Sequence, residues 1–203
     1  MAIFRPGQSS DDGELMVVET PVFNYTNPGI NVGGPPGDFY ADGGFRFINV
    51  MVPAGTITSA KITFRAGATQ AAACSLRIKG HDIDNSATFS TWSDFVTRVR
   101  TTAFVNWTPT AWVAGSDYDT LDISAIIQEI VDRPGWVSGN NLTIFVEHVS
   151  GLMRYIRSYD GDTVNCARLE IITTPAGPTM GQIMKEGKWF SGGIFQGHWL
   201  GWR

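Results

Sequence analysis

The side chains that commonly do chemistry are few in this sequence and widely spaced. Its three histidines, His81, His148 and His198, include no pair at metal-ligand spacing, so we expect each to be an ordinary packed or surface residue. Cys74 and Cys166 could form one disulfide, although two buried thiols on strands fit the pattern better. No nucleophile elbow, phosphate-binding loop or paired-carboxylate signature is present. The carboxylates of a glycosidase could still converge in the folded chain, but we expect no catalysis.

Two aspartates around a glycine are the candidate for metal binding. Asp160, Gly161 and Asp162 could supply oxygen ligands to calcium, which prefers several hard oxygen donors. The same residues also fit a plain turn between two strands. Asp160 and Asp162 are therefore candidate calcium ligands, and no other cofactor is expected.

Exposed tryptophans could bind a sugar, because an aromatic ring packs well on the apolar face of a pyranose. Trp92 and Trp112 lie in polar stretches, which favours exposure of their rings. Trp107 and Trp136 directly follow an expected strand and an expected helix, so they are predicted to belong to the core. Trp92 and Trp112 are therefore the candidate glycan-binding residues.

Residues 121–136 are the one segment with a helical period. Their apolar residues recur three or four positions apart and would form one buried stripe: Ile123, Ile126, Ile127, Ile130 and Val131. Asp122 is the predicted N-cap, and Pro134-Gly135 is expected to end the helix after about three turns. We expect this helix to close one open end of a β-structure or to cover one of its faces.

The sequence from residue 45 onward alternates as strands do. Cys74, Leu76 and Ile78, for example, alternate with polar residues. Roughly eight such short strands, about ten to twenty residues apart, are typical of a two-sheet sandwich or jelly roll. Repeated strand-then-helix units are missing, which excludes a parallel α/β sheet. We predict an all-β fold, a jelly-roll β-sandwich with one short helix.

Five segments of the chain follow one another in a familiar order. They read FRFINVMVPAGTITSAKITF, SLRIKGHDIDNSATF, VNWTPTAW, LDISAIIQEIVDRPGW and RSYDGD, the last before a terminal strand. This order resembles the jelly-roll modules of many bacterial and phage-borne surface proteins, which are similar in fold to carbohydrate-binding modules. The resemblance covers about two thirds of the chain and implies a fold, whereas one fold hosts many functions.

The two ends of the chain differ from this module. Residues 1–43 are rich in Gly and Pro turn formers, and only residues 15–25 could hold a strand, so we expect an extended N-terminal arm. Residues 44–175 are the predicted jelly roll. Residues 176–203 are a separate Gly/aromatic docking tail.

The tail places seven large apolar side chains within fourteen residues: Trp189, Phe190, Ile194, Phe195, Trp199, Leu200 and Trp202. Left in water, they would forgo about 10–20 kcal/mol, at roughly 1.5–3 kcal/mol each. The tail could fold back on its own sandwich, or it could dock on a neighbouring subunit or larger assembly. We favour docking, because interspersed glycines permit close backbone approach and aromatic anchors dominate such contacts.

Composition narrows the range of partners. A formal net charge of −4 without a basic run argues against nucleic acid and anionic membrane surfaces. No apolar stretch is long enough to span a membrane, and the first twenty residues lack the apolar core of a secretory signal. We expect a protein made in a host cytoplasm.

These observations favour a structural virion protein of a bacteriophage. It would be a capsid decoration, fibre or adaptor subunit that attaches through its terminal segments and displays the jelly roll, with other virion proteins and copies of itself as partners. A homo-oligomer is expected, and a trimer is one option. The alternative is a non-catalytic carbohydrate-binding module whose tail caps its own domain. Both can hold if the virion subunit contacts host surface glycan.

Overall fold

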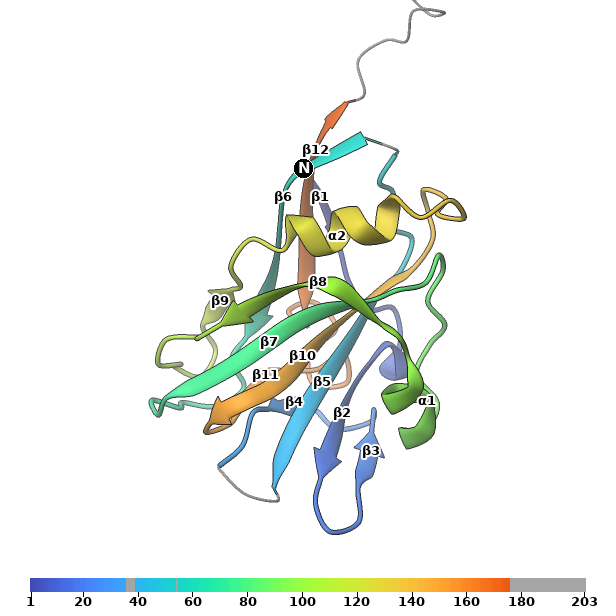
Figure 1. Ribbon diagram of the computed structural model, residues 1–203. Helices are drawn as coiled ribbons and strands as arrows, with labels where there is room; N and C mark the ends of the chain where they lie inside the picture. The colour runs from blue at the N-terminus through green and yellow to red at the C-terminus, as the bar shows by residue number, and fades with distance from the viewer. Residues whose placement is uncertain (36–38, 54, 176–203) are drawn as a thin grey trace, which may run out of the picture.

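A computed structural model describes residues 1–35, 39–53 and 55–175, which form antiparallel sheets with short helices (Figure 1). The four-stranded sheet has the order β1 (Ala2–Phe4), β12 (Arg168–Pro175), β6 (Gly55–Arg65), β9 (Asp117–Asp119). The six-stranded sheet has the order β3 (Val22–Asn24), β2 (Asp12–Val17), β5 (Tyr40–Phe47), β10 (Leu142–Gly151), β7 (Cys74–His81), β8 (Arg100–Trp107). A two-stranded sheet pairs β11 (Arg154–Arg157) with β4 (Gly29–Val32). The helices are η1 (Ser9–Asp11), α1 (Trp92–Thr97) and α2 (Ser124–Val131). The all-β prediction is confirmed.

The two larger sheets share one apolar core. Phe45 on β5 and Phe64 on β6 meet with ring centroids 4.9 Å apart, so the sheets are in direct contact. The period-two alternation predicted for β7 is present. Cys74, Leu76 and Ile78 are buried, while Ser75 and Arg77 between them are half-buried. The arrangement is that of a β-sandwich.

The predicted helix forms as α2 and is shorter than residues 121–136. Its buried stripe is Ile126, Ile127, Ile130 and Val131. Ile123 occupies the N-cap position, so the prediction of Asp122 as N-cap is wrong. The Asp122 carboxylate instead accepts the N–H groups of Ser124 (3.1 Å) and Ala60 (2.9 Å), which ties the helix start to β6. α2 packs against β6, β7 and β8 and thereby closes one open end of the sandwich (Figure 1).

A second, six-residue helix, α1, forms in the polar stretch that contains Trp92 and is not predicted by any helical period. Thr91 is its N-cap and accepts the Asp94 N–H (3.1 Å). Phe95 on its inner side is buried, and Arg98 after its end donates to the carbonyls of Ala87 and Thr88. Tertiary contacts therefore fix a helix that is too short to show a period of its own.

The N-terminal residues differ from the expected extended arm. β1 pairs with β12, β2 lies between β3 and β5, and β4 pairs with β11, so this part of the chain belongs to the same sheets as the rest. Glycines conceal the alternation of these strands in the sequence. Gly13 of β2, for instance, lies against an aromatic ring, and a Cβ there would lie 2.9 Å from Phe23 Cζ.

Candidate functional site

A cleft of about 330 Å³ opens on the outer face of the six-stranded sheet, beside α1. We call it the sheet cleft. Its walls include residues from β2, β5 and α1 and from the start of β8: Leu15, Tyr40, Asp42, Trp92, Val96 and Arg100. One of the two predicted glycan-binding tryptophans is therefore part of a concave surface.

Strand alternation places the polar groups of the sheet cleft. Along β5, Tyr40 and Asp42 face outward, whereas Ala41 between them is fully buried. β2 runs antiparallel beside β5, and its Leu15 is paired with Asp42 in the register. The floor of the cleft is thus built from strand residues, which hold their side chains more rigidly than a loop would.

Helix α1 supplies the aromatic rim of the sheet cleft. Phe95 is anchored against Phe89 and Phe145, with ring centroids 5.5 Å and 5.2 Å apart. Trp92, one turn earlier at the helix start, keeps 45% of its surface exposed. The prediction that Trp92 is exposed is confirmed, and a ligand in the cleft could contact its ring.

Asp42 is the carboxylate of the sheet cleft. Its Oδ1 accepts the backbone N–H of His148 at 2.6 Å. Burial raises the pKa of Asp42 to about 6, with Glu147 adding to the rise and the His148 N–H and Arg100 opposing it. Asp42 is therefore mainly ionised at neutral pH and takes up a proton in mildly acidic solution.

The groups around Asp42 are held in fixed positions. Arg100 donates to Glu147 Oε1 (2.9 Å), and its guanidinium lies 3.4 Å from the ring centroid of Phe145. Tyr40 stacks on His148, with ring centroids 5.0 Å apart and an interplanar angle of 22°. Glu147 also pairs with Lys79 (3.7 Å), so two cations and two carboxylates meet around this part of the cleft.

These side chains suit a hydroxylated ligand. Tyr40 and Trp92 offer aromatic surface, while Asp42 can accept hydrogen bonds from hydroxyl groups. Glu147 is the carboxylate beside Asp42, and it is paired with Arg100. Asp42 and Glu147 are therefore not two free carboxylates of the kind that glycoside hydrolysis uses. The sheet cleft could therefore hold such a ligand by ring stacking and hydrogen bonding.

Trp112 does not reach the sheet cleft. It is 1% exposed, and its ring stacks on Tyr118 with centroids 5.1 Å apart, so the prediction of an exposed glycan-binding residue is wrong. Reciprocal backbone hydrogen bonds between Trp112 and Gln70 draw this polar stretch back onto the sandwich. Trp107 is buried as predicted, and Trp136 is half-buried against the core.

Asp160 and Asp162 are engaged within the protein. Asp160 Oδ1 accepts the Ser9 hydroxyl (2.7 Å). Asp162 Oδ1 accepts the N–H groups of Val164 (3.1 Å) and Asn165 (2.9 Å). This geometry fits the turn alternative, and the described residues contain no group of three or more His, Cys, Asp or Glu side chains positioned to hold a metal.

The reactive side chains singled out in the sequence are placed as follows. Cys74 and Cys166 are separate buried thiols, and burial raises the pKa of each to about 11. His81 is buried against Ser86, and burial together with nearby arginines lowers its pKa to about 4. His148 packs on Tyr40. His198 and the predicted docking residues Trp189, Phe190, Ile194, Phe195, Trp199, Leu200 and Trp202 lie outside the described residues.

The sequence reasoning missed Tyr40, Asp42 and Arg100. Tyr40 and Asp42 fell within the supposed arm, where glycines hide the strand pattern. The available signal was that Tyr40 and Asp42 alternate with the small residues Ala41 and Gly43, as they would on a strand. Nothing in the sequence indicates that Arg100 lies beside them.

Comparison with known proteins does not assign this chain to a family. No protein-family description matches it, and no curated protein matches it. In the described part of the chain, no helix is long and apolar enough to cross a membrane.

Proposed function

We propose that this protein is a non-catalytic structural subunit of a bacteriophage virion: a capsid decoration, fibre or adaptor protein. It assembles with copies of itself and with other virion proteins, and it displays a sandwich of jelly-roll type. The observation that carries the proposal is the aromatic tail, with seven large apolar side chains in residues 189–202. In water these side chains would forgo about 10–20 kcal/mol.

The described core supports this role for the tail. Residues from both sheets and from α2, such as Phe64, Ile144 and Ile127, have no exposed surface. Because the described elements bury this core among themselves, the tail's aromatic residues are available for another surface. Aromatic anchors of this kind are typical centres of subunit contacts.

Sedimentation equilibrium of the full chain tests the proposal. We expect the average mass to rise with protein concentration, and Trp199→Ser/Trp202→Ser to shift the chain toward monomer because two anchors are lost. Circular dichroism and thermal unfolding of the double variant should match the parent. A parent chain that stays monomeric at high concentration, or a variant that assembles equally well, would contradict the proposal.

A second function, glycan binding, is favoured by the sheet cleft. The cleft is lined by the exposed ring of Trp92, by Tyr40, which stacks on His148, and by the partly buried carboxylate of Asp42. A virion surface subunit could use this cleft to contact a host glycan. The alternative of a carbohydrate-binding module thus moves from Trp112 to the residues of the sheet cleft.

A glycan array with the full chain tests this second function. Any binding should be lost in Trp92→Ala and strongly reduced in Tyr40→Ala. Phe104→Ala is the matched control, because Phe104 is an exposed aromatic residue on β8 that does not line the sheet cleft. Absence of binding across a broad array, or equal losses in all three variants, would contradict glycan recognition by this cleft.

A further inference from the structure

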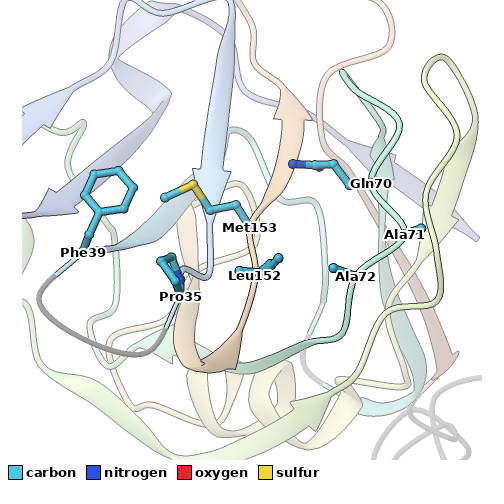
Figure 2. A pocket seen from close by; sticks show the side chains of 7 residues that line it. All are labelled: Pro35, Phe39, Gln70, Ala71, Ala72, Leu152 and Met153. Carbon is cyan, nitrogen blue, oxygen red and sulfur yellow. The ribbon is translucent and has the colours of Figure 1, made fainter.

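A second pocket lies at one end of the sandwich, where three connections meet (Figure 2). We call it the end pocket. Its walls come from the β4–β5, β6–β7 and β10–β11 connections: Pro35, Phe39, Gln70, Ala72, Leu152 and Met153. The cavity measures about 400 Å³, and none of the described residues that line it carries a charge.

The end pocket exposes apolar surface that is already in place. Phe39 and Leu152 are 39% and 45% exposed. The backbone at Leu152 is held in place, because its N–H donates to Ala73 O (2.7 Å). Buried Arg154 donates to Ala72 O (2.7 Å), so the opposite wall is fixed as well. A preformed apolar pocket loses little conformational entropy when it is filled.

The strand register places the end pocket far from the point where the described chain stops. Pro175 pairs with Gly55, at the start of β6, whereas the pocket residues Gln70 and Ala72 follow the end of β6. β6 has 11 residues, and at about 3.3 Å per residue its ends lie roughly 33 Å apart. β12 runs toward Pro175, so the described chain stops on the side of the sandwich opposite the end pocket.

The outer face of the four-stranded sheet carries charged side chains between β12's end and this pocket. Ion pairs cross it, between Lys61 and Asp119 (2.7 Å) and between Arg65 and Asp117 (3.0 Å). Residues 189–202, by contrast, include no Asp, Glu, Lys or Arg. Their composition matches the apolar described lining of the end pocket and not these ion pairs.

We propose that residues 189–202 of one copy dock in the end pocket of the next copy. This inference rests on the proposed function and names its contact surface. The cavity is within the usual range for small ligands, about 300–1,000 Å³, so it takes one or two aromatic anchors of the segment. Because tail and pocket are different surfaces, the contact is head-to-tail, and repeating it gives a ring or a filament.

Mixing experiments with full-length variants test this contact by sedimentation. Leu152→Glu blocks the end pocket, and Ala72→Glu is a second variant of the same pocket. Trp199→Ser/Trp202→Ser disables the tail. Val137→Glu is the control, because Val137 is an exposed apolar residue outside the pocket, in a turn hydrogen-bonded to Val50 shortly before β6 starts.

We expect the pocket variants and the tail variant each to be monomeric, with association roughly 30-fold weaker or more, as for loss of a central anchor. An equimolar mixture of Leu152→Glu and the tail variant should form pairs and nothing larger, because one intact tail meets one intact pocket. Val137→Glu should assemble like the parent chain.

Other outcomes overturn the inference in distinguishable ways. Normal assembly of both pocket variants, with loss only in the tail variant, would refute the end pocket and leave the proposed function standing. Loss of assembly in Val137→Glu alone would place the docking surface near Val137, at the end of the sandwich where β12 stops, and not in the end pocket. A mixture without pairs, or a monomeric parent chain, would refute head-to-tail docking, and the monomeric parent would refute the proposed function too.

Discussion

Asp12 and Glu14 are buried carboxylates on the same strand, but their surroundings differ. Glu14 accepts three N–H groups, from Asn27 Nδ2 (2.8 Å) and from the backbone and side chain of Asn31 (2.6 Å and 2.9 Å). Asp12 accepts one, from Tyr159 (2.8 Å), and its other oxygen has no partner among the described residues. Burial raises the pKa of Asp12 to about 8, and the nearby Asp160 and Asp11 add to the rise.

Asp12 therefore makes stability depend on pH. Its folded pKa lies above the ordinary value, so its contribution is fully present below about pH 4 and is lost as the pH rises toward 8. Asp12→Asn should remove this loss, and at pH 9 the variant should be more stable than the parent by on the order of a few kcal/mol. Urea unfolding at several pH values measures the difference.

Glu14→Gln is the matched control for Asp12→Asn. An amide cannot accept the three N–H groups that Glu14 accepts, so this variant should be destabilised throughout the pH range. If Asp12→Asn lost stability at pH 9 to the same extent as Glu14→Gln, the charge of Asp12 would not be the cause.

Trp112 has a structural role, since its ring lies between Tyr118 and Trp107. Trp112→Ala should cost about 3–5 kcal/mol of unfolding free energy, as for other large-to-small changes in a core. Trp92→Ala removes the same atoms from a partly exposed ring and should cost much less. Equal losses in the two variants, measured by urea unfolding, would contradict the burial of Trp112.

At the scale of elements, α2 protects an edge of the six-stranded sheet. Glu129 on α2 accepts the N–H groups of Thr102 and Ala103 on the edge strand β8, each at 2.7 Å. These bonds occupy donors that an edge strand otherwise presents to solvent or to another chain. The helix thus closes the end of the core and also covers part of a sheet edge.

Glu129→Ala should lower the unfolding free energy by roughly 1–3 kcal/mol, because both N–H groups lose a charged acceptor. Hydrogen exchange should accelerate at Thr102 and Ala103 and stay unchanged in β6. The control Glu19→Ala, at an exposed glutamate after β2, should stay within about 0.5 kcal/mol of the parent. Unchanged exchange in β8 would contradict the role assigned to Glu129.

The elements differ in how well the sequence predicts them, for physical reasons. α2 is predictable because its isoleucines repeat with the helical period, and β7 because polar residues separate its buried ones. α1 is missed because its six residues carry no period and its stability depends on Phe95 and Arg98 packing against distant parts of the chain. β5 is missed in part because Gly43 and Gly44 stand where side chains would collide with neighbours.

At the scale of the whole molecule, the N-terminal strands are integral to the fold. β2 is hydrogen-bonded to β5 along one edge of that strand, and Asp11 forms an ion pair with Arg46 of β5. Deleting residues 1–17 should therefore abolish cooperative unfolding in urea, since β5 and β12 each lose a neighbour. A chain that unfolded cooperatively without these residues, at an unchanged midpoint, would behave as though they were the extended arm expected from the sequence.

For the candidate binding surfaces too, neighbouring residues in the sequence predict some features, whereas others depend on contacts that only the folded chain makes. Exposure of Trp92 was predictable because its neighbours Thr91, Ser93 and Asp94 are polar. Burial of Trp112 was not, because it depends on Tyr118 and Gln70, which only the folded chain brings to it. The end pocket likewise arises from three connections that are distant in sequence.

An image of assemblies formed by the full-length chain, at a resolution that traces side chains, tests the central claim most directly. We predict that residues 189–202 lie against a neighbouring copy, with aromatic side chains seated beside Leu152 and Met153. If those residues instead pack wholly within their parent subunit and touch no other chain, the protein does not assemble through its tail, and the claim that the tail is a subunit contact is wrong.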